Sequence, residues 1–90
     1  MRLSDLITEL LEILRSGEQD LTWSSYASVD DAVNELEDLR QKISDPEAQQ
    51  RLRFLCLPTG ALEEIAISSG WAKEWLRLVN EEYGPDLYPQ

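Results

Sequence analysis

Histidine is absent from the chain, and this limits the chemistry that its side chains could perform. The 90 residues therefore lack the commonest general base, the commonest neutral metal ligand and the side chain that titrates near neutral pH. The single cysteine, Cys56, lies in the apolar run of residues 54–57, with no second cysteine or histidine to activate it. We expect a buried core thiol at Cys56 and no internal disulfide.

Neighbouring carboxylates are the remaining groups that could act in catalysis or bind a metal. Asp30-Asp31 and Glu63-Glu64 are such pairs. Neither pair lies in a loop with alternating acidic ligands and a central glycine, which an EF-hand calcium site requires. A small helical chain also offers little cleft in which two carboxylates could act on a sugar. The sequence therefore predicts no catalytic residue, no metal ligand and no cofactor.

Charge is the unusual part of the composition. Eight Lys+Arg against 18 Asp+Glu give a net charge of −10, whereas the hydrophobic content of 42% is ordinary for a globular protein. Residues 1–45 hold eleven acids and four bases, and residues 46–90 hold seven acids and four bases. Such a field speeds the encounter with a basic partner and repels nucleic acid and anionic membranes. Maintaining solubility is the simpler role of the same charge.

The start of the chain does not resemble a targeting segment. Asp5, Glu9 and Glu12 interrupt the apolar stretch that a signal peptide needs. No apolar run approaches the roughly 18 residues that a membrane span requires. Because the chain also has a free thiol and no cysteine pair, we expect a soluble protein of the cytoplasm, with no membrane partner.

A chain of 90 residues can bury one core, so we expect one domain. Apolar residues at three- and four-residue spacing predict a first helix, which Ser4 caps and Gly17 ends. Ser28 is the start signal of a second helix, which continues to about residue 44. Residues 18–27 have no period and are expected to form a loop.

Residues 46–57 admit two interpretations. Asp45-Pro46 is a typical helix start, because proline is favoured at the first helical position. The alternation of basic and apolar side chains over residues 51–54 also permits a short strand. No other segment offers that strand a partner, so we favour the helix.

Two further helices follow Pro58. Thr59 can cap a short helix over residues 60–68, and the last helix extends over residues 71–83, where Gly84-Pro85 ends it. The predicted fold is therefore all-α, a small orthogonal bundle of about five helices, two of them short, with no sheet. Residues 1–84 are expected to form the domain and residues 85–90 a C-terminal tail, which is either frayed or lightly pinned by Leu87 and Tyr88.

Residues 60–83 resemble a helix-turn-helix. In that motif a small residue on the first helix, a glycine in the turn and apolar residues on the second helix allow tight crossing. Ala66, Gly70, Leu76 and Val79 stand at those offsets. The resemblance implies a DNA-binding regulator, which is the alternative function for this chain. However, the same residues carry two positive and five negative charges, which lack the basic footprint that phosphate binding needs.

Two groups of residues are candidates for contact with a protein partner. Asp31, Glu35 and Asp38 are spaced to share the polar face of the second predicted helix. Trp71 and Trp75 lie one turn apart on the last helix, which is apolar over more than one face. Their stripe is either core or a partly exposed contact site, since tryptophan is enriched at binding hot spots.

We therefore expect a non-catalytic acidic protein that acts by binding another protein, one with a basic surface. An adaptor, an inhibitor and an immunity-type or antitoxin-like protein fit the same residues equally well. A homo-oligomer joined through the aromatic helix is a third hypothesis.

Overall fold

The computed structural model describes residues 2–22, 24, 26–58 and 60–88. Over these residues the chain has helices and no strand, so the all-α prediction is confirmed. The elements in chain order are α1 (Arg2–Arg15), α2 (Val29–Gln41), α3 (Pro46–Leu55), α4 (Ala61–Ser69), α5 (Ala72–Leu76), the π-helix η1 (Arg77–Glu82) and α6 (Gly84–Leu87).

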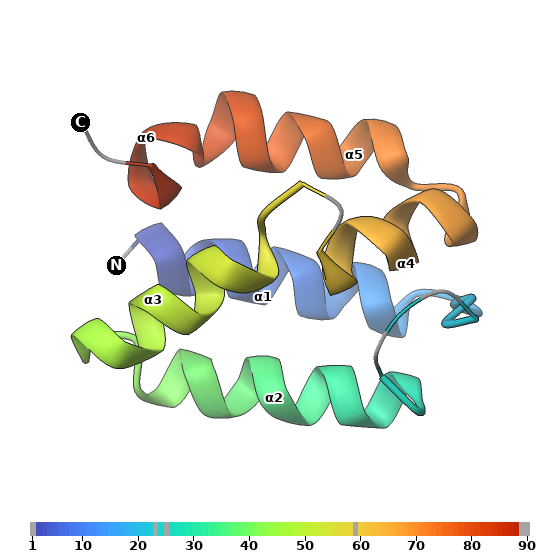
Figure 1. The fold of residues 1–90 in the computed structure, drawn as a ribbon, viewed down its shortest axis with the longest axis horizontal. Coiled ribbons are helices and arrows are strands. Elements are labelled where there is room, and N and C mark those ends of the chain that lie inside the picture. Colours follow the sequence, from blue (N-terminus) through green and yellow to red (C-terminus); the bar gives the residue numbers. More distant parts are fainter. Residues whose placement is uncertain (1, 23, 25, 59, 89–90) are drawn as a thin grey trace.

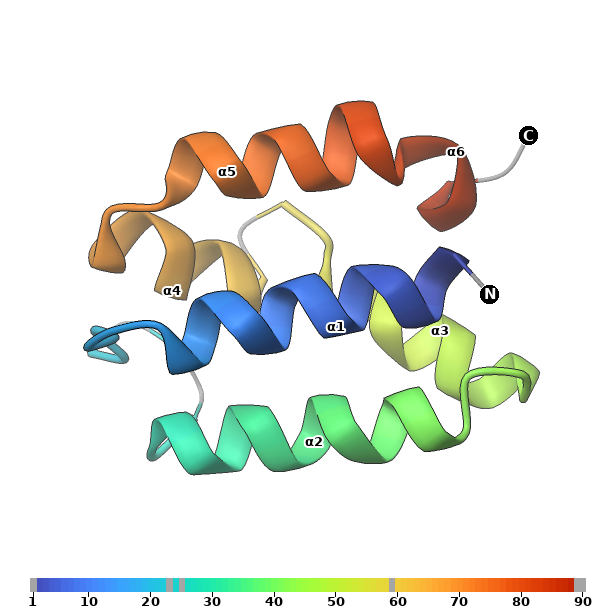
Figure 2. The ribbon, with the colours of Figure 1, turned by 180° about the vertical axis from the view of Figure 1, so that it is seen from behind.

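Helix α1 is the centre of the bundle. In both ribbon views it lies between α2 and the continuous rod of α5 and η1, while α3 and α4 run obliquely to it (Figures 1 and 2). Its leucine and isoleucine stripe is almost entirely buried because neighbours approach from several sides. The residues of α1 in the core are Leu3, Leu6, Ile7, Leu10, Leu11 and Leu14.

Side-chain caps fix the starts of α2 and α3. The Ser28 hydroxyl accepts a hydrogen bond of 3.2 Å from the Asp31 backbone N–H, as its position in the sequence predicts. A carboxylate oxygen of Asp45 accepts one of 3.1 Å from the Glu47 N–H, with Pro46 in the first turn. Residues 46–55 are therefore a helix and not a strand. Thr59, the expected cap of α4, lies outside the described residues, and Gly60 occupies the N-cap position.

The turn between α4 and α5 is a left-handed glycine cap. Gly70 has a φ of 87°, and its N–H bonds to the Ile67 carbonyl while the Trp71 N–H bonds to the Ala66 carbonyl at 2.9 Å. This pair of bonds is the Schellman motif, which satisfies carbonyls at the end of a helix. Glycine suits the position because it alone adopts positive φ without steric cost.

Replacing Gly70 with alanine is expected to lower the free energy of unfolding by about 1 kcal/mol or more. A Cβ on Gly70 would have no neighbour within 4 Å, so the cost is backbone strain alone. Gly17→Ala is the matched control, because its Cβ would also be free and its φ is not positive. Denaturant titration of both variants checks the prediction, and equal stabilities would contradict it.

The C-terminal third differs from the sequence-based expectation. The predicted helix over residues 71–83 is α-helical only to Leu76, and it continues as η1, where the Tyr83 N–H bonds to the Leu78 carbonyl at 2.8 Å. This wider turn brings Val79 and Tyr83 into the core together. This helix ends before Gly84-Pro85, as predicted, but the same two residues also begin a short further helix, α6.

Residues 85–88 pack on the bundle, in agreement with the alternative that Leu87 and Tyr88 pin the expected tail, and residues 84–87 are helical, which the sequence did not predict. Leu87 is 0% exposed in the core beside α1, and the Tyr88 N–H bonds to the Gly84 carbonyl at 2.9 Å. Proline in the first turn of α6 has no N–H to leave unsatisfied, so it starts a helix as readily as it ends one. No described helix is long and apolar enough to cross a bilayer.

Candidate interaction surface

Cys56 is a core residue, as predicted. Its side chain is 1% exposed, and burial raises the pKa of the thiol to about 12. A thiol in this state is protonated at neutral pH and is a poor nucleophile. Within the part of the chain that the structure describes, no group of three or more Cys, Asp or Glu side chains is placed to hold a metal ion.

Glu35, one of the three residues of the predicted acidic face, forms contacts inside the molecule. Arg51 on α3 donates two hydrogen bonds of 3.1 Å to the two Glu35 oxygens, and the Tyr26 hydroxyl donates another. Burial raises the pKa of the Glu35 carboxyl, but the hydrogen bonds from Arg51 and Tyr26 lower it more, so it lies below its ordinary value. Glu35 thus joins the loop before α2 to α2 and α3.

The other two residues of that predicted face lie at the surface. Asp31 is exposed at the start of α2, and no basic side chain pairs with it among the described residues. Asp38 is also exposed but forms an ion pair with Lys42, with 3.2 Å between the Asp38 Oδ2 and the Lys42 Nζ. The three residues therefore lie on one helix but differ in their contacts. Of the three, only Asp31 carries a charge that no basic side chain among the described residues neutralises.

Most of the positive charge is used within the molecule. Arg2, Arg15, Lys42, Arg51 and Arg77 have carboxylate partners. Arg40 donates to the Thr8 hydroxyl, and Arg53 to the carbonyls of Leu87 and Asp86. Within the described ranges, the acids without a basic partner are Asp5, Glu12, Glu18, Asp20, Asp30, Asp31, Asp45, Glu47, Glu64 and Glu81.

Four of these carboxylates gather at one end of the bundle, which we call the acidic end and define as Glu18, Asp20, Asp30 and Asp31. The loop that carries the first two and the start of α2 lie at the same end in both views (Figures 1 and 2). The sequence contains a signal for this end: residues 16–39 hold seven acids and no base.

The loop of the acidic end is fastened to the turn between α4 and α5. The Asp20 N–H donates to the Ser69 hydroxyl at 2.8 Å, and the Trp71 indole N–H donates to the Gln19 side-chain carbonyl at 2.8 Å. Hydrogen bonds from Thr22 lower the pKa of Asp20, so its carboxylate stays charged. A hollow of about 440 Å³ separates the loop from α4, lined by Glu18, Gln19, Asp20, Ser68 and Ser69. The loop that carries Glu18 and Asp20 is thus held in a defined position by hydrogen bonds to Ser69 and Trp71.

The tryptophan pair is mainly core, so Trp75 is not a surface contact residue. Trp75 is 1% exposed, and its indole N–H donates to Glu63 at 3.3 Å. Trp71 is half-buried and meets Trp75 edge to face, with 6.2 Å between the ring centroids. Since the Trp71 indole N–H also donates to Gln19, Trp71 helps to hold the loop of the acidic end in place.

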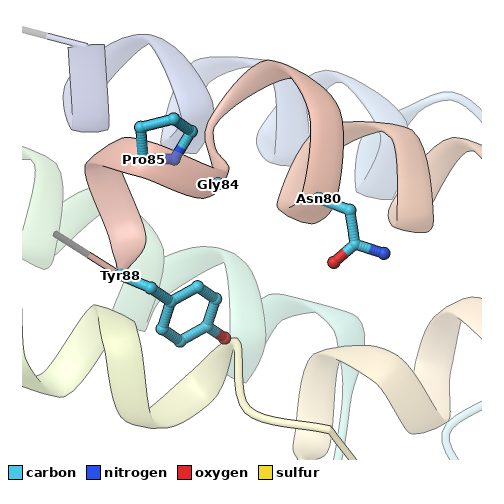
Figure 3. Close-up of a pocket in the computed structure, with 4 residues that line it drawn as sticks. All are labelled: Asn80, Gly84, Pro85 and Tyr88. Carbon is cyan, nitrogen blue, oxygen red and sulfur yellow. The ribbon is translucent and has the colours of Figure 1, made fainter. Parts of the chain in front are cut away.

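The large apolar side chains that do reach the surface lie elsewhere, and sequence reasoning missed them as a group. They are Phe54, Leu57, Ile67, Leu76 and Tyr88. Tyr88 also lines a groove of about 490 Å³ with Asn80, Gly84 and Pro85. Figure 3 shows the Asn80 and Tyr88 side chains pointing toward the space between the C-terminal helices and the α3–α4 connection. The sequence did not reveal this groove, because Pro85 and Tyr88 fall in the expected C-terminal tail.

The helix-turn-helix resemblance holds at the turn but only in part at the second helix, where Val79 is buried as the motif requires and Leu76 is not. Ala66 is buried and Gly70 is left-handed, as the motif requires. Leu76, which the motif would bury against the first helix, is 50% exposed, and Trp75 takes the buried place. The physical reason is that α5 and η1 turn the side that carries Trp75 and Val79 toward the core.

Comparisons with protein-family models, with curated protein sequences and with solved structures find no match to this chain.

Proposed function

We propose that the chain is a non-catalytic, cytoplasmic binding protein whose acidic end docks on the basic surface of another protein. The observation that carries this proposal is that many surface carboxylates have no basic partner, while most basic side chains are already paired. Ten described carboxylates have no basic partner, whereas most cations are held by carboxylates, a hydroxyl or carbonyl groups of the same chain.

Uncompensated charge acts at long range. Charges that face solvent attract an oppositely charged partner over about 10 Å at 0.1 M salt, and they raise the rate of encounter more than the final affinity. At the acidic end the loop is already fixed by Ser69 and Trp71. A partner therefore meets a preformed surface, and little conformational entropy is lost on binding.

The same charges disfavour the alternative of DNA binding. Of the cations in residues 60–83, Arg77 is shared by Glu9, Glu74 and Glu82. Lys73 is then the one basic side chain in residues 60–83 for which the described part of the structure shows no partner. Specific DNA binding relies on several phosphate contacts, so the turn at Gly70 is better explained as architecture.

The test is a charge reversal at the acidic end, Asp30→Lys with Asp31→Lys. A partner is first isolated by co-purification with the unmodified chain from its native cell, and association is then followed by stopped-flow fluorescence. We expect the association rate constant at about 50 mM salt to fall by about tenfold, because the steering field is weakened. The rate should also depend less steeply on salt.

Glu12→Lys with Glu81→Lys is the matched control. Both residues are exposed and have no described basic partner, and the pair changes the net charge by the same amount away from the acidic end. Circular dichroism shows whether each variant is folded. Equal rates for the two double variants would remove the acidic end from the proposal, and binding that is indifferent to salt would refute the electrostatic basis.

A further inference from the structure

The turn at Gly70, which the sequence places in a helix-turn-helix, also holds the loop of the acidic end. Each neighbour of Gly70 binds one residue of that loop. Ser69 accepts a hydrogen bond of 2.8 Å from the Asp20 N–H, and the Trp71 indole N–H donates one of 2.8 Å to the Gln19 side chain. Two consecutive loop residues are therefore bound by one turn, although 49 and 52 positions separate the partners in the sequence.

The backbone of Gly70 brings the two binding side chains to the same place. Gly70 turns the chain within one residue, since its φ of 87° is a conformation that glycine adopts without steric cost. Ser69 therefore ends α4 and Trp71 directly precedes α5. The turn and the loop lie at the same end of the bundle in both ribbon views (Figures 1 and 2).

Burial does little to hold the loop residues 16–22. None of them is buried, and only Gln19 and Leu21 are half-buried. Gln19 also donates to the Ile13 carbonyl at 3.1 Å, so its side chain joins the end of α1 to the turn. The loop carries two of the seven acids of residues 16–39, a stretch without a base, and like charges repel. The position of the loop therefore depends on its hydrogen bonds to the turn.

We propose that Ser69 and Trp71 are positioning residues for docking at the acidic end, an inference that rests on the function proposed above. Their hydrogen bonds keep the loop carboxylates beside those of α2. A fixed loop loses less conformational entropy on binding than a mobile one, so loss of either bond should weaken binding although no charge changes. In this role the helix-turn-helix turn serves a protein-binding surface and not DNA.

Native-state amide exchange of the full chain, followed by NMR, tests the positioning without a partner. Trp71→Phe removes the indole N–H and keeps an aromatic ring beside Trp75, whereas Ser69→Ala removes the hydroxyl acceptor. Each bond is monitored through the other. The Asp20 amide in Trp71→Phe and the Trp71 indole N–H in Ser69→Ala should each exchange about fivefold faster. Ser68→Ala should change neither rate, because Ser68 lines the same hollow without a side-chain hydrogen bond among the described residues.

Binding of an oligolysine peptide, a probe for a basic surface, tests the docking. The amide signals of the acidic end report the binding in an NMR titration. In Trp71→Phe and in Ser69→Ala the dissociation constant should rise about fivefold. Its dependence on salt should stay the same, because no charge is lost. Asp30→Lys with Asp31→Lys should instead reduce the salt dependence, so a lost position and a lost charge give different results.

Two results would overturn the proposal. One is exchange in both Trp71→Phe and Ser69→Ala at the rates of the unmodified chain. The other is faster exchange with an unchanged dissociation constant, since the loop would then move without any effect on docking. Ser69→Ala is a small change at the surface, so it carries the test even if Trp71→Phe fails to fold. If oligolysine leaves the signals of the acidic end unshifted in the unmodified chain, the proposed function itself fails, and the positioning role fails with it.

Discussion

Replacing Trp75 with alanine is expected to lower the free energy of unfolding by about 3–5 kcal/mol, the range for deleting a large aromatic side chain from a core. Trp75 is 1% exposed, packs edge to face on Trp71 and donates to Glu63. The substitution removes these contacts and leaves a cavity that a small bundle cannot easily close. Urea denaturation followed by far-UV circular dichroism measures the change.

Leu76→Ala is the control for Trp75→Ala, because the two residues are neighbours and Leu76 is 50% exposed. Its effect should stay within about 0.5 kcal/mol, as for most surface substitutions. The comparison separates the two orientations of this helix. A larger loss for Leu76→Ala than for Trp75→Ala would mean that the helix-turn-helix arrangement, with Leu76 inside, is the correct one.

Leu87→Ala is expected to destabilise the protein by about 2–5 kcal/mol, since a fully buried leucine is removed. Leu87 is 0% exposed, and its carbonyl accepts a hydrogen bond of 2.8 Å from Arg53. The measurement is thermal or urea unfolding. Leu57→Ala, at a leucine that is half-exposed in the α3–α4 connection, is the control and should cost far less. A neutral result for Leu87→Ala would restore the view that the last residues are a tail.

The sequence predicted a helix or its end correctly where the pattern lies within a few neighbouring residues. The stripe of α1, the Ser28 and Asp45 caps and the glycine at position 70 each depend on a few neighbouring residues. The π-helix could not be found this way. Val79 and Tyr83 are both buried beside this wider turn, and the Tyr83 hydroxyl donates to Glu9 on α1, so the π-helix depends on packing between elements.

The sequence predicted the negative charge of the candidate site but not which residues form it. The net charge and its excess in the first half follow directly from the composition. Which acids remain uncompensated depends on distant arginines: Glu35 is held by Arg51, sixteen positions away in the sequence. Spacing on α2 alone places Glu35 beside Asp31, and only the packing of α3 on α2 distinguishes them. The groove beside Tyr88 also involves residues far apart in the sequence, since the Tyr88 hydroxyl donates to the Cys56 carbonyl.

The two ends of the chain meet in the folded bundle, and this constrains when folding can finish. Arg2 donates to the Asp86 carboxylate at 3.0 Å and to the Glu82 carbonyl at 2.5 Å, across separations of 84 and 80 residues. Contacts of such sequence separation form only after the intervening chain is available. Helix α2, which packs most closely on α1, follows it directly in the chain, whereas η1 and α6 come last. The Arg2 end of α1 is therefore expected to be completed late in folding, after α2 has packed on the rest of that helix.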